Sequence, residues 1–454
     1  MKKLLLTGFA LVAVLAQAQN SWVPQGTKFA TSFGVDEMVI VDANTVWINA
    51  YDGSGAGTYP KAVSRTVNGG TSWTANNVSG PGTNSLASDL AAVDANTAWL
   101  ATAGTSASPN SNAIWKTTNG GSTWARQTIG YTGASFTNLV YFWNANEGWT
   151  GGDPKNGVFE TYKTTNGGTT WAAVTGLPLP SASDEYGLTG AKAVSGDHIW
   201  FGTTKGRIFH STNRGATWTA NYSPALDFGG GAAGGGVDGS FAKMAFKDGN
   251  NGLLIAVDGQ VNATMYATTD GGATWGDPMT PTGTWFFGDI TYVPGTANTY
   301  VTTGINSNAS QGTGSAYSTD GGLSWTIIDN IPGIEGGQRG KVKFFNATTG
   351  WAGFFSDGPT GSEGIFKFSG NLALATSETA VKSNLKVYPN PATDVVNVTS
   401  NKKIESVNII DLAGKKVNGA KGSQINVSNL AKGTYILQVN YGEGAVENTK
   451  LIKK

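Results

Sequence analysis

Six acidic residues are the first candidates for chemistry in this chain. Two carboxylates that face each other across a cavity can cleave a glycosidic bond, one as an acid and the other as a base or nucleophile. Acidic residues near the variable loops between apolar segments are Asp89, Asp184, Glu185, Asp238, Asp289 and Glu335. Their spacing pairs no two of them, and isolated surface carboxylates are usually just solvated. They are weak catalytic candidates, and whether the protein is an enzyme stays open.

Two other residues could contact a ligand directly. Trp285 begins the run Trp285-Phe286-Phe287, which could form a stacking platform for a sugar or a partner or could equally supply core residues. Arg339 lies in a variable loop, and its planar guanidinium suits a carboxylate ligand. We take Trp285 and Arg339 as the ligand-binding candidates.

Metal, thiol and phosphate chemistry have little support. The chain has no Cys and only two His, His198 and His210, which lie in neighbouring strand segments. His210 occupies a position that other repeats fill with Lys116 or Lys163, which favours a surface strand position. The glycine-rich run 228–239 lacks the Lys-Ser/Thr ending of a phosphate-binding loop. We therefore expect no metal and no cofactor.

A repeat indicates the turns and strands that must position any site. Six octapeptides end in Trp residues spaced 51, 47, 47, 57 and 50 residues apart. A period near 50 is typical of solenoids and propeller blades. Asn or Asp at the third position can bond its own backbone, Gly supplies positive φ, and Trp starts the next strand. The six copies are TVNGGTSW (66–73), TTNGGSTW (117–124), TTNGGTTW (164–171), STNRGATW (211–218), TTDGGATW (268–275) and STDGGLSW (318–325).

A second repeat predicts seven hairpins. The segment 41–47 (VDANTVW) recurs as 93–99 (VDANTAW), and five looser copies follow. The seventh hairpin has no closing octapeptide, but Asn20-Ser21-Trp22-Val23 resembles the end of one. We infer that the N-terminal segment closes the ring by supplying the outer strand of the last blade. A six-bladed ring with a stray hairpin is the alternative.

The octapeptides resemble the Asp-box repeat, also called BNR, of sialidases, xyloglucanases, sortilin-type receptors and photosystem II assembly factors. The resemblance implies a β-propeller in which the boxes are structural turns opposite the ligand face. The turn-forming residues would be Asn68, Asn119, Asn166, Asn213, Asp270 and Asp320. The ligand face would then carry the variable loops between blades and after each second strand. Sialidase activity is disfavoured, because the chain has five Arg, only Arg339 falls in such a loop, and the Arg-Ile-Pro motif is absent.

The last 70 residues resemble a second family. Three landmarks are 387–398 (VYPNPATDVVNV), 407–415 (VNIIDLAGK) and 430–439 (LAKGTYILQV), and the chain ends in 450–454 (KLIKK). They are similar to the type A C-terminal sorting domain of the type IX secretion system of Bacteroidetes. The resemblance implies export across the outer membrane, with the secretion machinery as a partner. The same stretch reads independently as a small β-sandwich, and a carbohydrate-binding or adhesion module is the alternative.

The N-terminus and the charge agree with a secreted protein. Lys2 and Lys3, the apolar stretch 4–15 and Ala16-Gln17-Ala18 form the three parts of a signal peptide. No later segment is long and apolar enough to cross a membrane. Residues 384–454 carry ten Lys against five Asp and Glu, which leaves about −7 on residues 19–383. This excludes a basic footprint for nucleic acid on the larger part.

The sequence therefore predicts an all-β chain, a seven-bladed β-propeller followed by a small β-sandwich. We expect a signal peptide at 1–18, the propeller at 19–372, a linker at 373–383 and the sorting domain at 384–454. The functional hypothesis is a secreted or cell-surface binding protein whose ligand is a polysaccharide or a cell-surface protein. The alternative is a secreted glycoside hydrolase.

Overall fold

The computed structural model describes most of the chain after residue 20. The described ranges are 21–104, 111–131, 135–223, 241–258, 262–305, 312–330, 338–355, 363–373, 385–400, 403–411, 415–441 and 446–454. The predicted signal peptide, the glycine-rich run, Asp238, Glu335 and nearly all of the predicted linker lie outside these ranges. The chain divides into two compact units, Met1–Ser377 and Glu378–Lys454.

Within the described ranges, the first unit has seven antiparallel sheets, each built mostly from strands that follow one another in the chain. The first sheet holds β2 (Phe33–Ile40), β3 (Val46–Asp52), β4 (Ala62–Thr66) and β5 (Thr74–Asn77), and the second holds β6 (Leu86–Ala92), β7 (Ala98–Ala103), β8 (Ala113–Thr117) and β9 (Ala125–Arg126). The third sheet holds β10 (Thr137–Phe142), β11 (Gly148–Lys155), β12 (Val158–Thr164) and β13 (Ala172–Ala173). The fourth holds β14 (Gly187–Ser195), β15 (His198–Thr203), β16 (Arg207–Ser211) and β17 (Thr219–Tyr222). The others are β18 (Phe241–Phe246), β19 (Gly252–Asp258) and β20 (Asn262–Thr268); β21 (Asp289–Tyr292), β22 (Tyr300–Ile305), β23 (Thr313–Ser318) and β24 (Thr326–Asn330); and β25 (Val342–Asn346), β26 (Thr349–Gly353) and β27 (Gly364–Ser369) with β1 (Ser21–Gly26).

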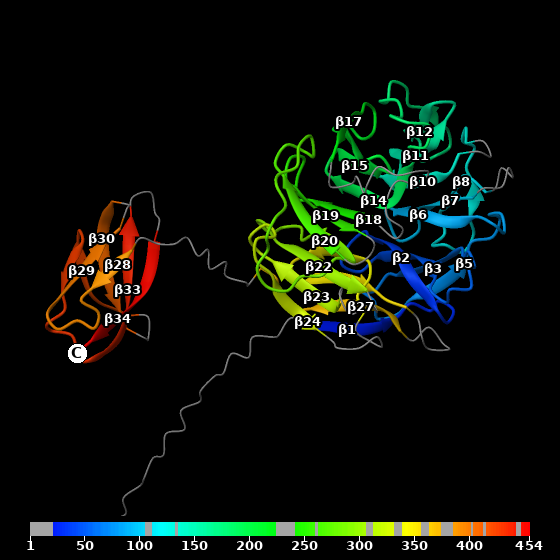
Figure 1. The fold of residues 1–454 in the computed structure, drawn as a ribbon. Helices are drawn as coiled ribbons and strands as arrows, with labels where there is room; N and C mark the ends of the chain where they lie inside the picture. Colours follow the sequence, from blue (N-terminus) through cyan, green and yellow to red (C-terminus); the bar gives the residue numbers. More distant parts are fainter. Residues whose placement is uncertain are drawn as a thin grey trace, which may run out of the picture. The chain divides into compact units, whose positions relative to one another are not determined.

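The first strands of these sheets contact one another in a closed circuit. The contacts run from β2 to β6, β10, β14, β18, β21 and β25 and then back to β2. Figure 1 shows β2, β6, β10, β14 and β18 toward the middle of this unit and β5, β8, β12 and β17 further out. The sheets are therefore arranged around a centre that the first strands line.

In six sheets, the octapeptide turn lies at the same edge as the turn between the first and second strands. In six sheets a backbone N–H of the octapeptide donates to a carbonyl of the turn between the first and second strands. In the second sheet, for example, Gly120 N donates to Asn96 O over 3.0 Å. Loops that join the second and third strands, and those between sheets, consequently lie at the opposite edge.

One sheet joins the two ends of this unit. Its strand order is β1-β27-β26-β25, and β1 pairs antiparallel with β27 from Ser21↔Ser369 to Gly26↔Gly364. Trp22 packs against Phe344 and Phe368, and its Nε1 donates to Ser315 Oγ over 2.7 Å. The chain is thus closed by hydrogen bonds between segments more than 330 residues apart.

Tryptophans at equivalent positions form much of the core. The second strands of five sheets carry a fully buried indole at Trp47, Trp99, Trp149, Trp200 or Trp351. Among the octapeptide tryptophans, Trp73, Trp124, Trp218 and Trp325 are also buried. Aromatic side chains bury a large area each, so these rings supply much of the hydrophobic stabilisation between sheets.

The second unit has two antiparallel sheets with one shared core. One sheet holds β28 (Lys386–Tyr388), β29 (Val395–Thr399) and β32 (Gln424–Asn426); the other holds β31 (Lys416–Lys421), β30 (Ile404–Ile410), β33 (Gly433–Tyr441) and β34 (Val446–Lys453). Val396 and Val398 of the first sheet belong to the same buried cluster as Val407 and Leu437 of the second. Neither unit contains a helix within the described ranges, so the part of the chain seen here has no helix that could span a membrane.

Candidate functional site

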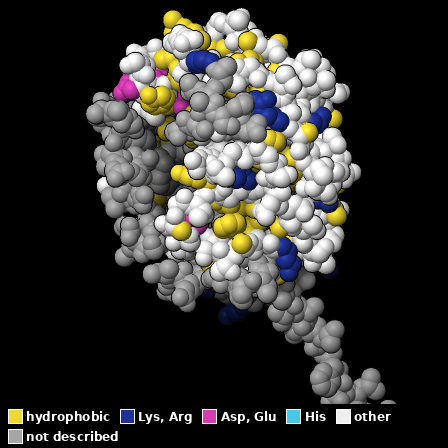
Figure 2. Space-filling view, turned by 90° about the vertical axis from the view of Figure 1, so that its right-hand side faces the viewer, with side chains coloured by type: hydrophobic (Ala, Val, Ile, Leu, Met, Phe, Trp, Pro, Cys, Tyr) yellow, Lys and Arg dark blue, Asp and Glu magenta, His cyan; other side chains and the backbone are white. Residues whose placement is uncertain are grey.

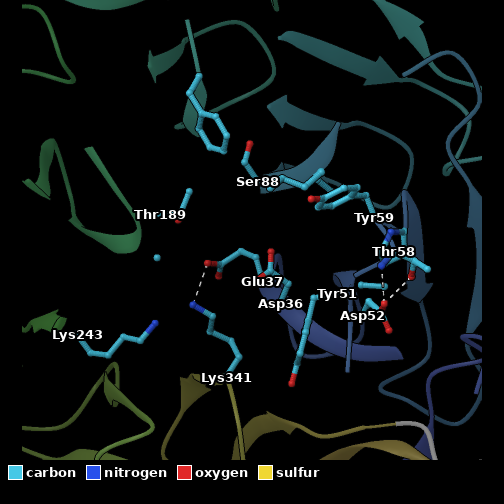
Figure 3. Close-up of a pocket in the computed structure, with 16 residues that line it drawn as sticks. Asp36, Glu37, Tyr51, Asp52, Thr58, Tyr59, Ser88, Thr189, Lys243 and Lys341 are labelled. Carbon is cyan, nitrogen blue, oxygen red and sulfur yellow. Dashed lines mark hydrogen bonds and ion pairs between the residues drawn. The ribbon is translucent and has the colours of Figure 1, made fainter. Parts of the chain in front are cut away.

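A cavity with polar and apolar lining lies in the first unit where the first strands begin. It has a volume of about 340 Å³ and is lined from β2, β3, β6, β14 and β18 and from residues just before β10 and β25. We call it the channel-mouth pocket. Figure 3 shows Asp36 and Glu37 beside Lys341, with Lys243 to the left of them and Ser88 and Thr189 above. It lies at the edge that carries the variable loops.

A bulge in β2 brings two consecutive acidic residues to this pocket. Successive strand residues normally face opposite sides of a sheet. In β2, however, Val35 pairs with Ala50 and Glu37 with Asn49, so Asp36 is an extra residue. β6 and β10 have the same irregularity at Ser88 and Asn138. The repeat of the bulge indicates that it belongs to the architecture of the first strands.

Ion pairs link the strands across the centre. Lys341 Nζ lies 3.1 Å from Glu37 Oε2, and Lys343 Nζ lies 4.0 Å from Glu37 Oε1. Lys192 of β14 reaches Asp89 of β6 over 2.5 Å and also donates to Val140 O of β10 over 3.1 Å. Burial of these charges is tolerable because each has an opposite charge or a backbone partner.

The pKa values of the acidic pair are shifted in opposite directions. Burial raises the pKa of Asp36 to about 6, although Lys341 opposes the shift. Burial would also raise the pKa of Glu37, but Lys341 and Lys343 hold it well below its usual range. The pKa of Lys243 is lowered by burial and by the nearby Lys341. At neutral pH both carboxylates are therefore ionised, while near pH 5 Asp36 carries a proton.

Two tyrosines form part of the pocket rim. Tyr51 at the end of β3 is 37% exposed, and Tyr59 in the following loop is 47% exposed. The loop is ordered by Asp52, whose carboxylate accepts hydrogen bonds from the backbone N–H and hydroxyl of both Ser54 and Thr58. The rim therefore offers exposed aromatic surface on a loop fixed by its own hydrogen bonds.

None of the four catalytic candidates that fall in the described ranges lines this pocket. Asp89 is buried and holds Val140 N and Lys192, while Asp289 accepts a hydrogen bond from Val342 N over 2.9 Å. Asp184 pairs with Lys205 over 2.8 Å. Glu185 is fully buried, accepts a hydrogen bond from Thr203 Oγ1 and pairs with Arg207 over 2.9 Å. Each side chain thus has a partner within the fold.

The two ligand-binding candidates also have internal partners. Arg339 is 3% exposed, pairs with Asp329 over 2.8 Å and lies 3.7 Å from the Phe366 ring centroid. Trp285 is partly buried and packs edge-on against Phe287 in an apolar cluster. Neither residue contributes to the channel-mouth pocket.

The octapeptide residues form closed local circuits. In the second copy, Thr117 Oγ1 donates to Asn119 Oδ1 and accepts from Gly121 N, while Asn119 Oδ1 also accepts from Thr123 N over 3.0 Å. Equivalent bonds are made by Asn68, Asn166, Asn213, Asp270 and Asp320.

The two histidines form a pair away from the pocket. His198 Nδ1 and His210 Nε2 are 2.9 Å apart, and the His210 ring stacks on Trp200. The described residues contain no group of three or more His, Cys, Asp or Glu that could hold a metal ion.

The acidic and basic residues of the pocket were missed by sequence reasoning. The signal was present, because Asp36, Glu37, Lys243 and Lys341 are charges within or just before apolar strand segments. Their meeting point depends on ring closure, which places β2 next to β25.

Comparison with solved structures identifies the fold of the first unit. A solved structure of YCF48 bound to D1 peptide is 14% identical with a TM-score of 0.51, covering 80% of this chain and 100% of its own. YCF48 from Cyanidioschyzon merolae is 14% identical with a TM-score of 0.50, covering 77% and 98%. An ancestral GH74 enzyme is 13% identical with a TM-score of 0.49, covering 94% of this chain and 63% of its own. The first unit has the β-propeller fold.

The C-terminal unit is assigned to a family by sequence. Residues 386–454 match the model of the secretion system C-terminal sorting domain. The protein is therefore exported by type IX secretion to the cell surface or the extracellular space. A search of curated proteins gave no match to this chain.

Proposed function

We propose that this protein is a secreted binding protein whose ligand occupies the channel-mouth pocket of a seven-bladed propeller. The blade count is supported by the seven sheets and the closed circuit of first strands. Residues 19–372 would form the propeller, 373–383 the linker and 384–454 a β-sandwich that serves export, after removal of a signal peptide at 1–18. Two sheets around one core support the sandwich.

The observation that carries this proposal is the arrangement of charges in the pocket. Hydrolysis of a glycosidic bond requires two carboxyl groups on opposite sides of the bond. Asp36 and Glu37 instead come from consecutive positions of one strand, and Glu37 is paired with Lys341. Balanced charges with exposed tyrosines at the rim favour recognition of a ligand over its cleavage.

The face of the molecule seen in Figure 2 gives no support for a nucleic-acid ligand. The face in Figure 2 consists mainly of uncharged side chains and backbone, with Lys and Arg in small separate groups. Such a face lacks the continuous basic stripe that phosphate backbones require. Polysaccharides and cell-surface proteins remain the two ligand classes of this proposal. Peptides are included in the test because one structural neighbour is bound to the D1 peptide.

A binding and turnover screen tests the proposal on the whole mature chain. Residues 19–454 would be applied to glycan and peptide arrays, and the same sample would be assayed for release of reducing sugars. We expect binding without turnover, weakened by Tyr59→Ala and unchanged by Asp184→Asn, whose side chain lies outside the pocket. Sugar release that is lost in Asp36→Asn would establish the hydrolase instead. Binding that is indifferent to Tyr59→Ala would place the ligand elsewhere.

A further inference from the structure

The channel-mouth pocket ends at a layer of charged side chains. A second cavity of about 540 Å³ lies farther along the first strands and is lined by the later parts of β2, β6 and β14, for example Leu90 and Val194. Glu37 lines both cavities, while Lys192 and Lys343 line only the second. The pairs Glu37–Lys343 and Asp89–Lys192 cross the space between these strands.

This layer determines which part of a polymer could enter. A polymer bound along its length needs a groove that is open at both ends. Here the inner end is occupied by the Asp89–Lys192 pair, whose side chains are 3% and 11% exposed, and by Glu37, whose side chain is 12% exposed and whose partner Lys343 is 39% exposed. Opening the layer would leave buried charges without partners, which is unfavourable. The pocket therefore admits a chain end and excludes a chain that passes through.

The charges of the pocket wall favour a neutral ligand rich in hydroxyl groups. Asp36 and Glu37 are acceptors, and Lys243 and Lys341 are donors. An anionic ligand would gain from the lysines but meet the carboxylates, and a cationic ligand would meet the reverse. A hydroxyl group donates one hydrogen bond and accepts others, so it can bond to a carboxylate and to an ammonium group at once.

The rim and the size of the pocket suit the ring of a sugar. The exposed faces of Tyr51 and Tyr59 are apolar surfaces with a polar tip, which is the kind of side chain that packs on ligands with apolar and wet sides. A volume of about 340 Å³ is at the lower end of the range for small-molecule sites. It suits the end of an oligosaccharide and not a folded domain.

We propose that the channel-mouth pocket binds the terminal residue of a neutral glycan, with its hydroxyl groups bonded to Asp36, to Lys243 and to the Glu37–Lys341 ion pair and its ring against Tyr59. This inference rests on the proposed binding function and specifies its ligand. It also predicts the orientation: the remainder of the glycan extends past the tyrosine rim into solvent.

The experiment measures affinity for neutral gluco-, manno-, galacto- and xylo-oligosaccharides by calorimetry on residues 19–454. Each active oligosaccharide is then compared with forms that are methylated or oxidised to a uronic acid at one terminal residue. We expect capping or oxidation of one end to abolish binding. Tyr59→Ala and Lys243→Met should each weaken binding by about tenfold or more, the effect of losing one charged hydrogen bond or one buried aromatic contact. Tyr222→Ala, which truncates another exposed tyrosine on β17, should leave affinity unchanged.

The other outcomes separate this inference from the proposed function. Equal affinity for free and capped chains, or a preference for uronic acid ends, would overturn the terminal neutral sugar. Binding of array peptides but of no oligosaccharide, with loss in Tyr59→Ala, would also overturn it while leaving the proposed function intact. Oligosaccharide binding unaffected by both pocket variants would contradict both proposals. An unchanged thermal unfolding midpoint would show that each variant is folded.

Discussion

At the scale of single residues, cationic side chains on tryptophans connect neighbouring sheets. Lys116 lies 5.0 Å from the Trp99 ring centroid, and its Nζ donates to Gly167 O in the next octapeptide over 2.7 Å. Trp99 Nε1 bonds the same carbonyl. In the fourth sheet His210 takes the place of the cation and stacks on Trp200 at 4.5 Å between ring centroids. The sequence already showed that His210 replaces a lysine, but the pairing partner on the neighbouring strand was not foreseen.

We predict that His210 makes the free energy of unfolding depend on pH. Burial and the nearby His198 lower the pKa of His210 to about 4. Between about pH 6.5 and 4 the unfolded chain therefore binds a proton that the folded chain does not, so this contribution to stability falls as the pH drops through that window. Urea unfolding at pH 7 and pH 5 should show a smaller loss for His210→Gln than for the unchanged protein.

The His210→Gln variant must be compared with the unchanged protein, because Asp36 changes the free energy of unfolding with pH in the opposite direction. Its pKa in the folded chain is about 6, above its ordinary value, so folding takes up a proton there and stability from this group increases as the pH falls. Asp36 is the same in both proteins and cancels from the difference. An identical pH dependence for His210→Gln would show that His210 titrates normally.

At the scale of elements, the octapeptide is a turn whose residues each have a defined partner. Asn119 accepts from the Thr117 hydroxyl and the Thr123 N–H and donates to Thr123 Oγ1 over 2.8 Å. Asp270 and Asp320 make the equivalent contacts in their own turns, where a carboxylate replaces the amide and the neighbouring hydroxyl becomes the donor. The turn therefore requires an acceptor oxygen at this position and tolerates either side chain.

This requirement predicts different outcomes for two substitutions at Asn119. Asn119→Ala removes three hydrogen bonds and should lower the free energy of unfolding by roughly 1–3 kcal/mol. Asn119→Asp keeps the acceptor and should cost little, because Thr123 Oγ1 can reverse its hydrogen bond. Urea titration of both variants measures the difference. Equal losses would mean that the turn is held by its glycines and its tryptophan, and that the side chain is dispensable.

The elements that could be predicted from the sequence are those encoded by neighbouring residues. The octapeptides and the polar turns such as 41–45 predict hairpins, because the Gly, Asn and Trp residues that form each turn lie within a few positions of one another. The pocket could not be found this way. Glu37 and Lys341 meet only after the ring closes, and the bulge at Asp36 leaves no local signal. Arg339 looked like a loop residue, yet Asp329 and Phe366 enclose it.

At the scale of the whole molecule, the two units have separate hydrophobic cores. Among the residues that the structure describes, the buried cluster of the second unit draws on residues from Leu385 onward, and the clusters of the first unit draw on residues between Trp22 and Leu372. We predict that removal of residues 378–454 leaves the unfolding midpoint of the first unit unchanged in calorimetry. A lower midpoint in the shortened protein would show that the sorting domain stabilises the propeller.

Closure of the ring by β1 gives a matched pair of substitutions within one strand. The Trp22 side chain is 9% exposed and packs with Phe344 and Phe368, whereas Val23 beside it is 49% exposed. Trp22→Ala should therefore lower the free energy of unfolding by about 3–5 kcal/mol. Val23→Ala should change it by less than about 0.5 kcal/mol, as expected for a surface position.

Deletion of residues 19–26 tests the same closure at the level of the backbone. It removes every hydrogen bond between β1 and β27 and leaves β27 as an open edge. Because open edges pair with other chains, the shortened protein should aggregate on size-exclusion chromatography while Val23→Ala stays monodisperse. If the deletion variant remained monodisperse with an unchanged unfolding midpoint, the circuit of first strands alone would hold the ring. The hydrogen bonds of β1 would then be dispensable, and the stability of the propeller would reside in the contacts between its innermost strands.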